Sequence, residues 1–284
     1  MLLVIAAGVL WSVQGLIFRQ IDTAGTWAVL VWRSVGMLPV LLAFLTWRAG
    51  GSPLPAIRGV GLAGVFGGLG LVAAFAGAIY SIQVTTIANA VFLFAASPFL
   101  TALIGWAVLG EKVRGETWAA IAVAMVGIFV MVREGLQGGA MAGNVAALLS
   151  ALGFAVFTVS LRWRKLTDTL PSVLLGGVFS IVVGMVVAAQ LGQTVAVPLA
   201  DASWAMAMGA ITLSGGMVLY TLGSKVVPAA ELALLSNIEV MLAPIWVWAL
   251  LGETASPNTF VGGAILLVAV MMNGVSGARR RRLA

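Results

Sequence analysis

Long, uninterrupted apolar segments constrain this chain more than any other feature of its sequence. Segments such as Trp118 to Val132 and Phe260 to Met272 are apolar on every side. The hydrocarbon core of a membrane is about 30 Å thick, and a helix needs roughly 20 residues to cross it. Strands of a membrane barrel would instead alternate apolar and polar residues over about ten positions. With 62% hydrophobic and 8% charged residues, the chain is predicted to be an all-α polytopic membrane protein.

Hydropathy predicts ten transmembrane helices joined by short connections. The connections carry turn or charge signals, as in Gly50 to Pro53 and Glu111 to Arg114, and they leave no room for a soluble domain. The predicted spans are residues 2–18, 27–47, 59–80, 84–109, 115–132, 141–161, 171–191, 203–222, 228–250 and 258–275.

The distribution of Lys and Arg supports this count and gives the chain an orientation. Cytoplasmic loops are enriched in these residues, and a wrong span count would scatter them over both sides. With the N-terminus inside, only Arg19 and Arg133 fall outside, while Arg33 lies within a span. Both termini are therefore predicted to be cytoplasmic, and the Arg279 to Arg282 tail is interpreted as an anchor for anionic lipid headgroups rather than for nucleic acid. The predicted cytoplasmic positions are Arg48, Arg58, Lys112, Arg114, Arg162, Arg164, Lys165, Lys225, Arg279, Arg280, Arg281 and Arg282.

Composition excludes several classes of chemistry. The chain has no cysteine and no histidine, so it lacks disulfides, thiolate nucleophiles and imidazole bases or ligands. We expect no metal, no cofactor and no enzymatic activity, because two membrane-depth carboxylates at catalytic spacing are also missing. The net charge of +6 comes from the ends of spans rather than from a patch, so nucleic acid is not expected as a partner. The apolar N-terminus lacks a basic leader and a cleavage site, and is predicted to be the first span.

One hexapeptide occurs in both halves of the chain. Trp106 to Glu111 reads Trp-Ala-Val-Leu-Gly-Glu, and Trp248 to Glu253, 142 residues later, reads Trp-Ala-Leu-Leu-Gly-Glu. At this offset the predicted spans superimpose from the second onward. Because each half has an odd number of spans, the second half must enter the membrane from the opposite side. We predict a five-helix repeat over residues 1–137 and an inverted repeat with a basic tail over residues 138–284.

The sequence resembles the EamA-type branch of the drug/metabolite transporter superfamily over essentially its whole length. The resemblance rests on ten short spans in two halves, and on two proline-containing segments that end in Leu-Gly-Glu, Ser97 to Glu111 and Asn237 to Glu253. It implies export of amino acids and related metabolites. It also implies a central cavity lined by spans 1, 3, 4, 6, 8 and 9.

Two charged residues, Arg33 and Glu239, lie well inside predicted spans, away from the ends of those spans. A carboxylate in the middle of the ninth span is costly unless it faces a cavity or a partner, so Glu239 is the strongest candidate for function. It is interpreted as a proton carrier, as a counter-charge for a substrate ammonium group, or as a residue that fixes helix packing. Arg33 lies about two turns from the outer edge of the second span, within snorkelling distance of the headgroups. The alternatives are a carboxylate clamp and an ion pair with Glu239.

Further cavity candidates lie on spans that the resemblance places around the cavity. Aromatic side chains suit an apolar wall and uncharged polar side chains suit a zwitterion, although both kinds also pack between helices. Pro98 and Pro244 are expected to kink spans four and nine, either because discontinuous helices form the site or for structural reasons alone. Besides Glu239, the predicted cavity residues are Trp11, Gln14, Phe75, Tyr80, Asn89, Phe92, Ser97, Phe154, Phe157, Thr212, Tyr220 and Asn237.

Glycine is concentrated in two repeat-equivalent segments, Gly61 to Gly77 and Gly209 to Gly223, in the third and eighth spans. Small residues let helices approach closely, so these segments predict tight packing. They also suit a hinge or gate.

Together these features predict a secondary transporter of the inner membrane that exports amino acids or similar small metabolites by alternating access. Two halves that rock about a central site provide inward-open and outward-open states of similar energy; the alternative is mere duplication of a structural unit. The expected partners are a small-molecule substrate and membrane lipid. The alternative functions are efflux of hydrophobic drugs or cations with Glu239 as the counter-charge, lipid flipping, and a membrane partner that transports nothing.

Overall fold

The computed structural model describes residues 1–138, 141–223 and 238–283, and contains helices but no strands in these ranges. Asn237, one of the predicted cavity residues, lies outside them. The helices are α1 (Leu2–Ser12), α2 (Gln14–Phe18), α3 (Thr26–Ala49), α4 (Leu54–Gly59), α5 (Gly61–Val84), α6 (Ile87–Phe94), α7 (Ser97–Leu109), α8 (Gly115–Gly138), α9 (Met141–Trp163), α10 (Leu170–Gln190), α11 (Leu199–Ala207), the π-helix η1 (Met208–Gly215), α12 (Gly216–Gly223), α14 (Ile238–Leu251) and α15 (Pro257–Leu283).

Eight helical segments of the described chain are long and apolar enough to cross a membrane. Two shorter apolar segments, Leu2–Phe18 and Ile238–Leu251, coincide with the first predicted span and with most of the ninth. Large apolar side chains also cover outward-facing surfaces, and Phe129 on α8, for example, is 66% exposed. Such a surface is compatible with lipid rather than water. The chain is thus a multi-pass helical membrane protein, as its composition predicts.

Two of the predicted spans are interrupted. The first is divided at Val13, between α1 and α2. The fourth is divided at Ala95 and Ala96, so that α6 ends before them and α7 begins after them, with Pro98 in its first turn. A proline is tolerated there because the first helical N–H groups have no partner within the helix. Pro244, by contrast, lies inside α14, which continues through it.

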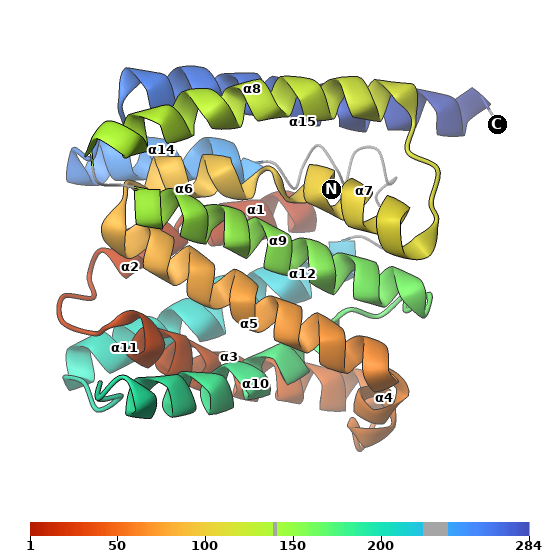
Figure 1. Ribbon diagram of the computed structural model, residues 1–284. Helices are drawn as coiled ribbons and strands as arrows, with labels where there is room; N and C mark the ends of the chain where they lie inside the picture. The colour runs from red at the N-terminus through yellow and green to blue at the C-terminus, as the bar shows by residue number, and fades with distance from the viewer. Residues whose placement is uncertain (139–140, 224–237, 284) are drawn as a thin grey trace.

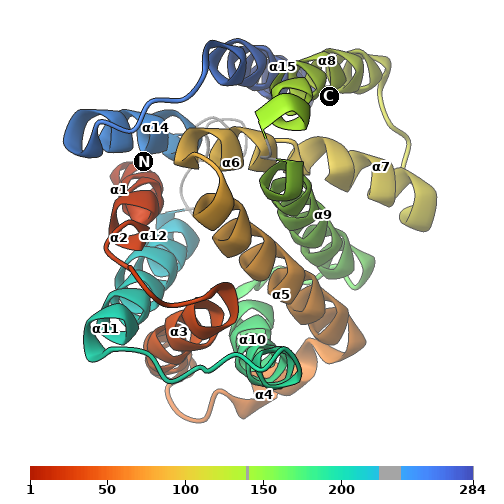
Figure 2. The same ribbon diagram turned by 60° about the vertical axis from the view of Figure 1, so that its left-hand side comes forward.

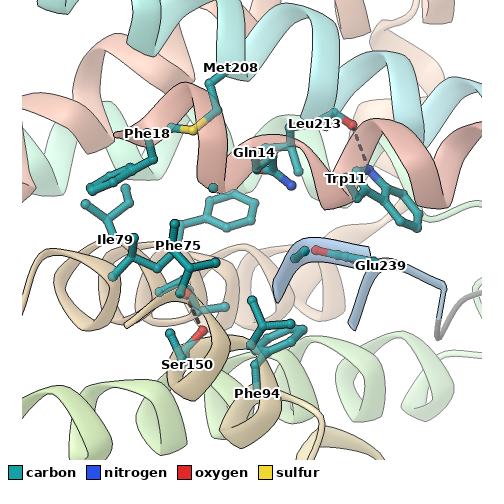
Figure 3. A pocket seen from close by; sticks show the side chains of 18 of the residues that line it. Trp11, Gln14, Phe18, Phe75, Ile79, Phe94, Ser150, Met208, Leu213 and Glu239 are labelled. Carbon is teal, nitrogen blue, oxygen red and sulfur yellow. Dashed lines mark hydrogen bonds between the residues drawn. The ribbon is translucent and has the colours of Figure 1, made fainter. Parts of the chain in front are cut away.

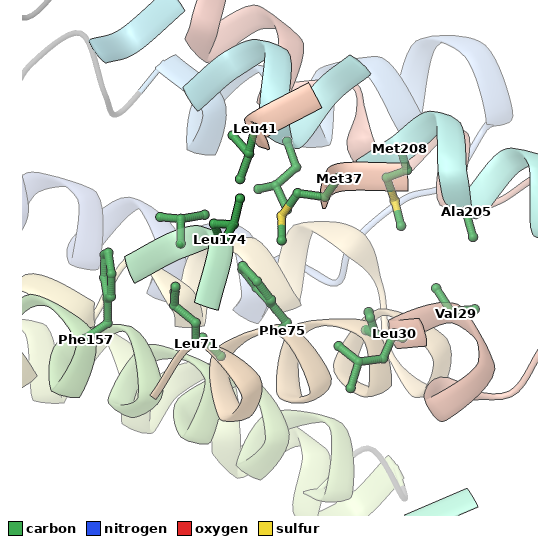
Figure 4. Packing of buried hydrophobic residues seen from close by; sticks show 14 of the residues in the cluster. Val29, Leu30, Met37, Leu41, Leu71, Phe75, Phe157, Leu174, Ala205 and Met208 are labelled. Atoms are coloured by element: carbon green, nitrogen blue, oxygen red, sulfur yellow. The ribbon is translucent and has the colours of Figure 1, made fainter. Parts of the chain in front are cut away.

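The helices are arranged as two outer pairs around a central group (Figures 1 and 2). α8 packs against α15 at one edge, and α3 packs against α10 at the opposite edge. Between them, α5 packs along α9, while α1 contacts α12 and α14. The largest buried cluster joins α3, α5 and α10 through side chains such as Leu41, Leu71 and Leu174 (Figure 4).

Glycines bring two helix backbones into direct contact. An added Cβ at Gly209 of η1 would collide with the carbonyl oxygen of Arg33 on α3, and one at Gly36 of α3 would collide with that of Met206 on α11, which continues directly into η1. The two helices therefore approach more closely than any larger residue at these positions permits. This contact fixes the part of α3 that carries Arg33.

The repeated Leu-Gly-Glu segments end their helices in the same way. Gly110 and Gly252 both adopt the left-handed conformation, with φ of 67° and 66°. In this conformation the N–H of the following residue turns back on the helix, so Glu111 donates to the Gly105 carbonyl and Glu253 to the Val247 carbonyl. Glycine is favoured at such a position because it has no Cβ. The sequence repeat is thus also a repeat of local structure.

Candidate substrate cavity

A cavity of about 200 Å³ lies among the central helices. Its wall comes from all six spans that the family resemblance implies, through α1, α2, α5, α6, α9, η1, α12 and α14, with Arg33 of α3 in addition. Most of the lining is apolar, and includes Phe18, Ile79 and Phe94 (Figure 3). An apolar chamber with a few polar groups is the usual form of a small-molecule site.

Five of the predicted cavity residues line this chamber: Trp11, Gln14, Phe75, Phe154 and Glu239. They come from both halves of the chain, and Glu239 lies on the same side of the cavity as Gln14 and Trp11 (Figure 3). Trp11 donates from Nε1 to the Leu213 carbonyl across 3.5 Å, so its ring is held against η1. The chamber therefore combines a broad apolar wall with a small polar region.

The other described candidates lie elsewhere. Tyr80 is 40% exposed. Asn89 donates to the side chains of Asn144 and Thr85, so its amide bridges helices. Thr212 donates to the Met208 carbonyl of its own helix. Phe92, Ser97 and Phe157 are buried outside the cavity lining, and Tyr220 stands behind Trp11 with ring centroids 5.6 Å apart.

Arg33 lines the cavity, whereas its position in the sequence favours a side chain that reaches toward the lipid headgroups. Its side chain is only 5% exposed and lines the chamber, so the expected snorkelling to the headgroups is wrong. An ion pair with Glu239 within 4 Å is also absent from the described part of the chain. The guanidinium carbon lies 4.3 Å from the centre of the Phe75 ring. The sequence shows a charged residue in an apolar span, but it does not show which way that residue faces.

An ion pair lies beside two residues of the cavity wall. Arg19 donates from Nε to Glu253 at 2.8 Å, and from its two terminal nitrogens to the carbonyls of Ile82 and Thr85 at 3.0 and 3.2 Å. The second Glu253 oxygen accepts from the Ile87 N–H at 2.7 Å. Ile82 and Ile87 themselves line the cavity. We call Arg19, Glu253 and the backbone groups they bind the cavity-end latch.

A second ion pair, Arg162 with Glu111, lies at the opposite end of the bundle, where α7 and α9 finish (Figure 1). Glu111 is the repeat equivalent of Glu253, and each arginine lies near the C-terminal end of the first span of its half. The second pair is more exposed, at 47% and 34% for its two side chains against 28% and 17% in the latch. The repeat therefore places one arginine–glutamate pair at each end of the bundle.

Asp201 fixes the connection between α2 and α3 rather than facing the cavity. Its carboxylate accepts from the backbone N–H groups of Asp22, Thr23 and Ala24 at 3.3, 2.9 and 2.9 Å, and from the Thr23 hydroxyl at 2.7 Å. Four donors satisfy this buried acid. It is therefore not free to bind a substrate.

The fold and the cavity define a multi-pass helical membrane protein with an internal, largely apolar cavity. The chain belongs to the EamA-like transporter family, whose model matches residues 1–133 and again residues 141–275. It is thereby placed in the drug/metabolite transporter superfamily. The description of that family is one of transporters, and its two matches together cover most of the chain.

Curated relatives agree with this assignment at low identity. The chain is 24% identical over 205 residues to the uncharacterized transporter YwfM of Bacillus subtilis (strain 168), a match that covers 68% of this chain and 65% of that protein, slightly less than two thirds. It is 24% identical over 199 residues to an uncharacterized transporter of Archaeoglobus fulgidus, with 68% and 69% covered. One solved crystal structure matches 95% of both chains with a TM-score of 0.67 and 17% identity, which is a similarity of fold.

Proposed function

We propose that this protein is a secondary transporter that exports amino acids or similar small metabolites across the inner membrane by alternating access. The observation that carries the proposal is the chamber between the two halves, largely apolar but with Gln14, Arg33 and Glu239 in its wall. A small molecule with an apolar side chain and a charged end fits this combination.

The proposed architecture is ten spans in two inverted halves, with both termini cytoplasmic. Helix contacts support the division into two halves, because the most extensive of them occur in pairs that exchange when the halves are exchanged. The contact of α5 with α9 corresponds to that of η1 and α12 with α1. The contacts of α6 and α7 with α9 correspond to that of α14 with α1. The contact of α10 with α5 corresponds to that of α3 with η1. Exchange of the two halves converts the α3–α10 pair into itself, and the same holds for the α8–α15 pair. The two separate matches to the family model support the same division.

Alternating access requires two ends that open in turn. The cavity-end latch and the Arg162–Glu111 pair supply repeat-related contacts at opposite ends. Symmetry-related contacts of this kind give two states similar energies, so that a modest contribution from a bound substrate can shift the balance. We propose that these ion pairs are the contacts that break and form as the protein changes state.

The transport proposal predicts saturable amino-acid flux in liposomes that contain the purified full-length protein. Counterflow of radiolabelled amino acids should exceed that of empty liposomes. Ala78→Trp, which places a large side chain in the chamber wall, should reduce it at least tenfold. Val126→Trp on α8, where the native side chain is exposed, is the matched control and should retain flux. Flux equal to that of empty liposomes across a broad amino-acid panel would refute the substrate assignment, and flux of hydrophobic cations alone would support drug efflux instead.

We also propose that Glu239 couples transport to protons, because it is a membrane-depth carboxyl group that faces the chamber. Glu239→Gln keeps the size of the side chain but removes its proton exchange. We expect the variant to retain counterflow while transport no longer responds to an imposed pH gradient, as initial rates with and without the gradient will measure. Gln14→Asn, which changes a polar group of the same wall without altering a charge, is the control and should keep the response. An unchanged gradient response in Glu239→Gln would exclude the coupling role.

A further inference from the structure

Arg33 is a buried cation whose charge no described side chain balances. Three other arginines, Arg19, Arg48 and Arg162, form ion pairs with acids at the ends of helices. Among the side chains that the structure describes, no carboxylate lies within ion-pair distance of Arg33. Charged groups inside a membrane bundle are costly and are normally paired or placed at a functional site. Packing alone therefore does not account for the position of Arg33.

Two hydrogen-bonding groups of Arg33 have no partner within the described chain. Its Nε and one terminal nitrogen are buried and have no hydrogen-bond partner in the described chain. The same side chain lines the chamber. Buried donors without partners are rare in native proteins, so two of them on one side chain at a cavity wall indicate a binding role. The planar guanidinium presents such donors as a fork that matches a carboxylate.

The guanidinium is also held in place. It lies over the Phe75 ring at 4.3 Å, an arrangement in which the face of the ring attracts the cation. The backbone of Arg33 is fixed by its close approach to Gly209. A side chain restrained at both ends loses little conformational entropy when it binds a ligand.

We propose that Arg33 binds the carboxylate group of the transported molecule, so that the chamber selects small carboxylates over their neutral analogues. The apolar walls then receive the rest of the molecule, and Gln14 remains for an amino group. This inference rests on the proposed function, because it assigns a substrate class to the chamber taken as the transport site. It names one group of that substrate and one residue that binds it.

Binding to the purified full-length protein tests the assignment without a transport cycle. The probes are L-alanine, L-threonine, L-leucine and L-phenylalanine, each compared with its carboxamide. We expect the wild-type protein to bind at least one of the four acids at least tenfold more tightly than its carboxamide. Arg33→Gln should weaken binding of that acid at least tenfold and leave binding of the carboxamide within twofold. Arg33→Lys, which keeps the charge but not the fork, should recover part of the loss.

Each other outcome has a defined meaning. Equal affinity of acid and carboxamide for the wild-type protein, together with measurable flux of the acid, overturns the Arg33 assignment and leaves the proposed function intact. No binding or flux of any amino acid overturns both. Loss of acid and carboxamide binding to the same degree in Arg33→Gln shows a structural role and also overturns the assignment. Size-exclusion elution of each variant, compared with the wild type, verifies that the variant is folded.

Discussion

Among glycine-to-alanine substitutions in the described helices, Gly209→Ala should destabilise the folded protein the most. The new Cβ would overlap the carbonyl oxygen of Arg33, and it would also press on the carbonyl carbon of Arg33 and the backbone nitrogen of Met37. These are backbone atoms that cannot rotate away, so α3 and η1 must separate. Overpacking of a core costs typically 1–3 kcal/mol and sometimes more, and we expect at least about 3 kcal/mol here.

Thermal stability of the detergent-purified protein, followed by size-exclusion chromatography after heating, measures this effect. We expect Gly209→Ala to be recovered in low yield or to aggregate well below the temperature at which the wild type does. Gly59→Ala is the matched control, because a Cβ at that helical glycine meets no atom within 4 Å, and it should behave like the wild type. Equal stability of the two variants would show that the α3–η1 contact is looser than described.

The spans could be predicted from the sequence because a membrane imposes a length and a composition on every helix. Their interruptions could be predicted only in part, because Pro98 indicates the break in the fourth span whereas nothing in the sequence indicates the break at Val13. α6 begins at a cap in which the Thr86 hydroxyl accepts from the Asn89 N–H, and both Thr86 and Asn89 lie within one hydropathy segment. The π-helix η1 likewise has the same apolar composition as its neighbours. Hydropathy averages over about 19 residues, so it cannot resolve such local changes.

The direction of side chains was harder to predict than the spans. In a helix that is apolar on every side, no polar stripe marks which face is buried. Phe75 therefore lines the chamber whereas Phe92, an equally plausible aromatic residue, packs in the core. Asn89 pairs with Asn144 on another helix, a partner 55 residues away that only the packing of α6 on α9 reveals. Arg33 was recognised as unusual, but its burial depends on the same unknown rotation.

The Leu-Gly-Glu repeat shows what sequence and structure add to each other. The six residues of each copy predict the two halves but assign no role to the glutamates. The structure gives both glutamates the same turn and an arginine partner. Only Glu253 also binds a backbone group of a cavity residue, Ile87. The equivalent residues therefore have unequal surroundings, which predicts unequal effects when each is replaced.

Glu253→Ala should open the chamber at the latch end. The substitution removes the acceptor of the Arg19 Nε and of the Ile87 N–H, two bonds that involve a charged group. Hydrogen bonds to charged groups contribute about 1.5–3 kcal/mol each when buried. Because the latch is partly exposed, we expect about 2 kcal/mol in total. At 1.4 kcal/mol for each factor of ten, the population open at this end should rise at least tenfold.

The absence of native cysteine allows this opening to be measured directly. Ala78→Cys introduces a single thiol into the chamber wall, and a membrane-impermeant maleimide added to right-side-out vesicles reports access from the latch end in the proposed orientation. Labelling should be at least tenfold faster when Glu253→Ala is added to the reporter. Glu111→Ala is the matched control, because it breaks the repeat-equivalent but more exposed pair at the other end, and it should not accelerate labelling from this face. If the two alanine variants label at the same rate from both faces of the membrane, then the ion pairs stabilise the folded bundle without controlling access to the chamber.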